Sequence, residues 1–153
     1  MNKVQTELNH KAELNLRLLK WIRILTSTWF WLGIWILYYL KFTDYAGIGL
    51  LETIGFTIAI ILEIPAGINS DRFGHKNNLI MYTAISLVGF IMFAMANSFW
   101  FLVVSVILAR GSYAFFSGSY EALVHESLNY LNKRDDYQRQ ISNNSGISLV
   151  VMA

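Results

Sequence analysis

Four long apolar runs constrain the fold of this chain more than any other feature of its sequence. They cover residues 22–40, 48–68, 79–96 and 99–124, and a fifth run begins near the carboxyl terminus, over 147–153. A helix needs roughly 20 apolar residues to cross the hydrocarbon core of a bilayer, because each residue adds about 1.5 Å. The four complete runs reach about that length. We therefore predict an all-α membrane protein with spans at these positions.

The amino-acid composition agrees with this interpretation. Of the 153 residues, 55% are hydrophobic and only 14% are charged, whereas soluble domains carry about 25% charged residues. The sequence contains no cysteine, which excludes a disulfide, a thiol nucleophile and a thiolate metal site. The net charge of +2 is too small to indicate a nucleic-acid partner.

The first apolar run does not resemble a cleaved signal peptide. It follows a polar and basic segment, residues 1–20, and it is rich in tryptophan. Signal peptides have a shorter apolar region and a cleavage site of small residues. We predict that residues 1–20 form a cytoplasmic basic arm and that residues 21–153 form the membrane domain.

The basic residues predict the orientation of the spans. Ten of the twelve lysines and arginines lie on one side of the predicted spans, whereas Lys41 lies on the other side and Arg110 lies within a span. The ten are Lys3, Lys11, Arg17, Lys20, Arg23, Arg72, Lys76, Lys133, Arg134 and Arg139. Positive charge is enriched on the cytoplasmic side of membranes. The amino terminus, the turn at 71–78 and the loop at 125–146 are thus predicted to be cytoplasmic.

Apart from Arg23, which opens the first span, four charged residues fall within the predicted spans: Glu52, Glu63, Arg110 and Glu121. Charges at membrane depth are costly and often mark a functional interior. Glu52 and Glu63 are 11 residues apart, as are Arg110 and Glu121, so each pair shares one helix face. Arg110 lies about 16 Å into its span, and we expect it to reach toward Glu63 if the second and fourth spans are neighbours.

Two roles are open for these charges. A buried ion pair can fix helix packing without any further function. Alternatively, Glu63, Arg110 and Glu121 can line a substrate or proton path. The sequence does not decide between the two.

The turn between the second and third runs has the polar sequence "SDRFGHK". An aspartate such as Asp71 can accept backbone N–H groups at the start of a turn or helix, and Gly74 can adopt a positive φ. Arg72 and Lys76 agree with a cytoplasmic position.

The order of residues in "GINSDRFGHK" resembles the signature loop between helices two and three of the major facilitator superfamily. Gly67, Asp71, Arg72, Gly74 and Lys76 match that signature, while a histidine replaces one of its usual cations. The preceding "LEIPAG" and the segment "LARGSYAFFSGSYEALVHESL" are similar to helices two and four of a bacterial branch of the family. The resemblance extends from about residue 22 to the end of the chain.

The resemblance implies specific roles for these residues. The signature loop of the family has a gating function, so Gly67, Asp71, Arg72, Gly74 and Lys76 would form a gate. Glu121 and Glu126 are its candidate acidic partners. Arg110 resembles an arginine linked to proton coupling in this family.

The resemblance also implies an overall function. The family consists of secondary transporters with twelve helices in two halves, so this chain would be an incomplete amino-terminal half of the helical bundle. We expect it to belong to a carrier that moves a small solute across the inner membrane of a bacterium by alternating access, as an efflux or ion-coupled system. The expected partners are membrane lipid, the solute, a proton as candidate coupling ion, and the missing carboxy-terminal half. We expect no cofactor and no activity of residues 1–153 alone.

Two other classes were weighed against a transporter. A small polytopic scaffold or subunit explains the spans but not the order of residues in the turn. An enzyme would need a clustered nucleophile, base or metal set, whereas His10, His75 and His125 are far apart in the sequence. We therefore predict no catalytic residue and no metal ligand.

Overall fold

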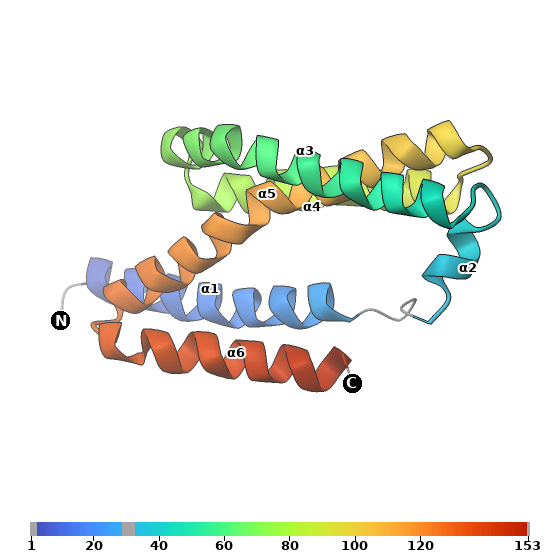
Figure 1. Cartoon of the computed structure of the whole chain (residues 1–153). Coiled ribbons are helices and arrows are strands. Elements are labelled where there is room, and N and C mark those ends of the chain that lie inside the picture. Colours follow the sequence, from blue (N-terminus) through green and yellow to red (C-terminus); the bar gives the residue numbers. More distant parts are fainter. Residues whose placement is uncertain (1–2, 29–32, 153) are drawn as a thin grey trace. The chain divides into compact units, whose positions relative to one another are not determined.

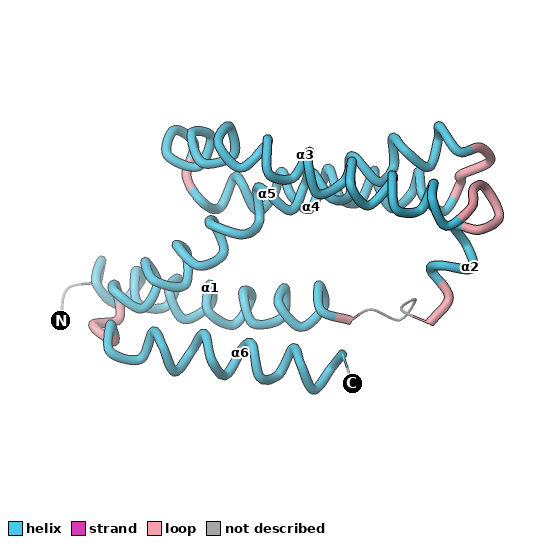
Figure 2. Tube along the Cα trace, in the orientation of Figure 1, coloured by secondary structure: helices cyan, strands magenta, loops and turns pink. Residues whose placement is uncertain are grey.

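A computed structural model describes residues 3–28 and 33–152. It is helical, and the described residues contain no β-strand (Figures 1 and 2). The helices are α1 (Lys3–Ser27), α2 (Trp35–Tyr39), α3 (Tyr45–Phe73), α4 (His75–Ala94), α5 (Phe99–Tyr130), the 3-10 helix η1 (Arg134–Asp136) and α6 (Tyr137–Met152).

Three of these helices, α3, α4 and α5, are long and apolar enough to cross a membrane. They contain nearly all of the predicted spans 48–68, 79–96 and 99–124, although α4 ends at Ala94. The prediction of an all-α fold is therefore confirmed for the described residues, and helices that could cross a membrane lie at three of the predicted positions.

The prediction of one continuous helix over residues 22–40 is wrong. α1 ends at Ser27, Thr28 is not helical, and α2 has only five residues; residues 29–32 lie outside the described part of the chain. The hydroxyls of Thr26, Ser27 and Thr28 each donate to a carbonyl one turn earlier, at 2.8, 2.8 and 2.9 Å. Hydroxyl bonds of this kind compete with the backbone ladder and weaken a helix.

The chain packs as two compact units, which are described separately. The first contains Met1–Phe30 and Tyr120–Ala153. In it, α1 and α6 lie side by side and run in the same direction (Figure 1). The amide of Asn144 donates to the hydroxyl of Tyr120 at 3.0 Å, and the guanidinium of Arg23 lies 5.8 Å from the centre of the Tyr120 ring. Polar contacts thus join the end of α5 to both neighbouring helices.

The predicted fifth span, 147–153, falls at the end of α6. This helix begins at Tyr137 and therefore includes ten residues, most of them polar or small, that precede the predicted span. The predicted boundary between the basic arm and the membrane domain, at residues 20 and 21, lies inside α1. The division of function at that boundary stays a prediction.

The second unit, Trp31–Ser119, contains α2, α3, α4 and most of α5. Its core consists of Tyr39, Ile48, Leu51, Leu102, Val103 and Val106. Leu51 and Leu102 are fully buried. By contrast, large apolar side chains such as Ile60, Ile64 and Phe90 are exposed on α3 and α4. An apolar surface of this kind marks a face that contacts lipid or protein.

Glycine allows the helices of the second unit to approach closely. A Cβ atom on Gly89 of α4 would lie 2.8 Å from the backbone nitrogen of Ala109 in α5. A Cβ on Gly55 of α3 would lie 2.8 Å from Cγ of Arg110. Small residues at such positions let membrane helices pack backbone to backbone. Gly111 of α5 likewise packs against α3, because a Cβ there would lie 3.0 Å from side-chain atoms of Ile58 and Leu62.

A single glycine reverses the chain between α3 and α4. Gly74 has φ of +85°, and its N–H donates to the carbonyl of Ser70 at 2.8 Å. The predicted positive φ is therefore confirmed. Of the two places considered for Asp71, the start of a helix is excluded, because Asp71 lies in the last turn of α3 and α4 has Gly74 as its N-cap residue. The connection is consequently tighter than the predicted turn at 71–78.

Candidate functional site

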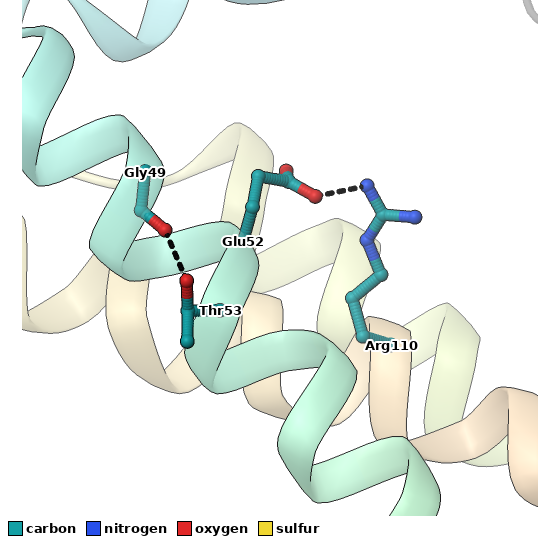
Figure 3. A network of polar contacts seen from close by, with 4 residues as sticks. All are labelled: Gly49, Glu52, Thr53 and Arg110. Carbon is teal, nitrogen blue, oxygen red and sulfur yellow. Dashed lines mark hydrogen bonds and ion pairs between the residues drawn. The ribbon is translucent and has the colours of Figure 1, made fainter.

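An ion pair joins two of the membrane-length helices. Nη2 of Arg110 in α5 donates to Oε2 of Glu52 in α3 at 2.6 Å (Figure 3). The neighbouring Thr53 does not take part, because its hydroxyl donates to the carbonyl of Gly49 within α3 at 2.8 Å. Among the described residues, Arg110 and Glu52 are therefore each other's counter-ion.

The point along α3 at which α5 packs explains why Arg110 bonds to Glu52. Gly55 lies against Arg110 and Val106, so Glu52 is located toward the amino end of that contact. α3 and α5 run in the same direction (Figure 1), and helical side chains lean toward the amino end of their helix. Arg110 thus extends toward Glu52.

The expected contact between Arg110 and Glu63 is wrong. Glu63 lies eight residues beyond Gly55 in α3, which is about 12 Å along the helix, and its side chain is exposed. Arg110 would have to extend against the direction in which helical side chains lean to reach it. The spacing of 11 residues identified a shared face but not the level at which the helices meet.

The pair lies in a half-buried environment with aromatic groups. The side chain of Glu52 is 20% exposed and that of Arg110 is 34% exposed. The guanidinium carbon lies 5.1 Å from the centre of the Phe56 ring, within the range of a cation–π contact. The buried Tyr39 is near enough to interact electrostatically with both charges.

One oxygen of Glu52 has no hydrogen-bond partner among the described residues. Oε1 is buried and accepts no hydrogen bond from the described part of the chain, and Figure 3 shows it directed away from the guanidinium. A buried acceptor without a donor is costly. The site can therefore accept one additional N–H, O–H or proton.

A second polar cluster, at the α3–α4 turn, was not found from the sequence. Asn78 is 1% exposed, and its amide nitrogen donates to the carbonyl of Ala66 at 2.8 Å and to the hydroxyl of Ser119 at 3.0 Å. Its amide oxygen accepts from Asn69. Asn78 thereby connects α4 to both α3 and α5.

His75 extends this cluster through a serine. Nδ1 of His75 lies 2.6 Å from the hydroxyl of Ser70, which lies 3.4 Å from the hydroxyl of Ser119. In the sequence, this cluster is indicated only by Asn77 and Asn78 at the start of an apolar run. The pattern does not show which of the two asparagines faces inward.

The chain matches no family model, and comparisons with curated proteins and with solved structures find no significant similarity. The candidate site therefore has to be interpreted from its own geometry and from the sequence pattern.

The residues of the predicted gate are exposed. Asp71, Arg72 and Lys76 lie on the surface around the α3–α4 turn, and within the described residues none of them forms an ion pair. Their candidate partners Glu121 and Glu126 are exposed and belong to the other unit. The gate stays a prediction.

The structure brings together only some of the charged residues that were predicted to lie within the spans. Arg110 lies in the site with Glu52, while Glu63 is exposed on α3 and Glu121 belongs to the other unit. Within the described residues there is no group of three or more histidine, aspartate or glutamate side chains that could hold a metal ion.

Proposed function

We propose that this chain is part of a secondary transporter of the major facilitator type, which moves a small solute across the inner membrane of a bacterium by alternating access. The ion pair between Arg110 and Glu52 carries the proposal. It joins two helices of membrane length, and charges at membrane depth mark a substrate or ion path by default.

The spare oxygen of Glu52 adds a functional argument to the pair. A purely structural pair gains most when every polar atom is satisfied, yet Oε1 has no donor among the described residues. An N–H or O–H group of a solute, or a coupling proton, would supply that donor. The signature-like loop from Gly67 to Lys76 supports the same class of protein.

A membrane scaffold without transport is the second candidate. The guanidinium of Arg110 already contacts Glu52 and Phe56, and such contacts can serve helix packing alone. The two candidates differ in one observable property, because only a transporter moves a solute.

Transport by the complete polypeptide that the gene encodes would test the proposal. Vesicles from cells that express it would be assayed with ethidium, as a lipophilic cation, and with radiolabelled glucose. Flux of one probe above that of control vesicles supports a transporter, and the Arg110→Ala variant should lose its dependence on the proton gradient. Absence of flux for both probes, with the protein present in the membrane, would favour the scaffold.

The predicted gate can be tested in the same vesicles. The Asp71→Asn variant should reduce flux by about tenfold, equivalent to about 1.4 kcal/mol, while its amount in the membrane is unchanged. Asp135→Asn removes a similar exposed charge outside the loop and should retain normal flux. Normal flux in Asp71→Asn would contradict the gating role.

A further inference from the structure

A cavity of about 440 Å³ lies within the first unit, between α1, the end of α5 and the start of α6. Three cationic residues from separate parts of the sequence line it: Arg17 of α1, Lys133 after α5, and Arg139 of α6. Within the described residues none of the three forms an ion pair. The cavity thus presents positive charge that an anion can neutralise.

The same cavity has an apolar wall. Leu16, Leu128 and Leu131 line it; Leu16 and Leu131 are half-buried, so each keeps some accessible apolar surface, whereas Leu128 is buried. A free inorganic anion gains nothing from such a surface, because apolar groups offer it no hydrogen bond. A ligand that combines an anionic head with a hydrocarbon part contacts both kinds of wall.

The other residues that line the cavity indicate which kind of anionic headgroup would fit there. Glu13 and Asp136 also line the cavity, so the three cations exceed the two carboxylates by one charge. Carboxylates accept hydrogen bonds, which favours a ligand that carries hydroxyl donors beside a singly charged anion. Gln140 and Asn143 provide amide donors for the anion.

We propose that this cavity binds the phosphodiester headgroup of an anionic membrane phospholipid whose head carries hydroxyl groups, as in phosphatidylglycerol. Arg17, Lys133 and Arg139 contact the phosphate, and Leu16 and Leu131 contact the start of the acyl chains. The lining falls at 13–17 and 128–143, within or beside segments that the distribution of basic residues predicts to be cytoplasmic. Basic pockets on that side of a membrane protein suit lipid headgroups.

Native mass spectrometry of the full chain would test this site. The protein would be reconstituted with phosphatidylglycerol or with phosphatidylcholine, extracted in mild detergent, and the retained lipid counted. Phosphatidylglycerol should be retained at least about fivefold more, since each basic residue near an anionic lipid contributes about 1 kcal/mol. Equal retention of the two lipids would overturn the proposal.

A matched pair of double variants separates the cavity from general positive charge. Arg17→Gln with Arg139→Gln should lower retention of phosphatidylglycerol by about 25-fold, which is about fivefold for each cation. Lys11→Gln with Lys20→Gln removes the same charge from exposed positions of α1 outside the cavity and should change retention less than about twofold. Equal losses in both would overturn the assignment to the cavity.

Two further measurements complete the test. Arg17→Lys with Arg139→Lys keeps the charge and should retain the lipid, so loss in the glutamine variant alone cannot result from misfolding. Soluble glycerol phosphate distinguishes a lipid from a free phosphate ester. If it raises the melting temperature of lipid-free protein and displaces the lipid, the phosphate site stands but the lipid as its source is overturned. The test does not depend on transport.

Discussion

The two polar sites of the second unit differ in charge and in completeness. Glu52 and Arg110 form a charged pair about 10 Å from the start of α3, and Oε1 of Glu52 has no partner among the described residues. At the other end of α3, Asn78 lies among amide and hydroxyl side chains, and both ends of its own amide are bonded.

This difference indicates a division of roles. Neutral hydrogen bonds between membrane helices contribute about 0.6 kcal/mol on average, and a satisfied cluster has no remaining capacity to bind a ligand. A charge left without its partner at membrane depth costs several times more. We therefore interpret the cluster around Asn78 as a packing element and the pair as the place where chemistry can occur.

The largest expected effect would come from breaking the pair. Arg110→Met should lower the free energy of unfolding by about 3 kcal/mol, because Glu52 would remain charged without a counter-ion. Glu52→Gln combined with Arg110→Met should recover most of that loss. Thermal and chemical unfolding in detergent would give the coupling energy of the pair.

The exposed pair between Lys11 and Glu7 serves as the control. Its atoms are 3.1 Å apart and both side chains are about two-thirds exposed, so Lys11→Met should cost less than about 0.5 kcal/mol. Similar losses for Arg110→Met and Lys11→Met would show that the half-buried pair stabilises the protein no more than the exposed pair does.

An intermediate effect is expected at the contact between α4 and α5. Gly89→Ala would place a methyl group 2.8 Å from the backbone nitrogen of Ala109 and should cost about 1–3 kcal/mol. Gly67→Ala is the matched control, because no atom lies within 4 Å and alanine favours a helix by about 1 kcal/mol.

Gly89→Ala also tests whether the Asn78 cluster and the Glu52–Arg110 pair are independent of each other. A shift of α4 away from α5 would lengthen the bond from Asn78 to Ser119 but leave the α3–α5 pair in place. The coupling energy between Glu52 and Arg110 should therefore be unchanged in this variant. A clear decrease would show that the two sites are not independent.

The smallest effect is expected at Asn78 itself. Asn78→Ala removes bonds to Ala66 and Ser119 and should cost about 1 kcal/mol. Asn77→Ala is the control, since Asn77 is exposed and its side chain donates locally, to the carbonyl of Phe73 four residues earlier across the α3–α4 turn. A loss near 3 kcal/mol for Asn78→Ala would mean that the cluster stabilises the protein as much as the Glu52–Arg110 pair does, which would contradict this prediction.

Local features of this protein were predictable from the sequence because they depend on nearest neighbours. The apolar runs predicted α3, α4 and α5, and Gly74 was correctly expected to have a positive φ. The prediction of one helix over the first run was wrong because it considered only the length of the run. It did not take into account three consecutive hydroxyl residues, which bond to carbonyls of their own helix at its end. Length and hydropathy do not register such competition.

The candidate site was predictable only in its components. Arg110 was recognised as a charge that needs a partner, but Glu63 was expected in place of Glu52, and the buried Asn78 was missed. Periodicity reports which residues share a face of one helix. It does not report how far two helices slide past each other, which here depends on glycines such as Gly55 that meet a neighbouring helix.

By itself, the sequence determined that this chain forms helices of membrane length and that a few charges must lie among them, since both follow from the cost of moving polar groups into hydrocarbon. The choice of partner for Arg110, the burial of Asn78 and the gathering of three distant cations around one cavity were decided only by the tertiary structure. These features depend on contacts between residues that are far apart in the chain, and close packing allows only some of those contacts to form.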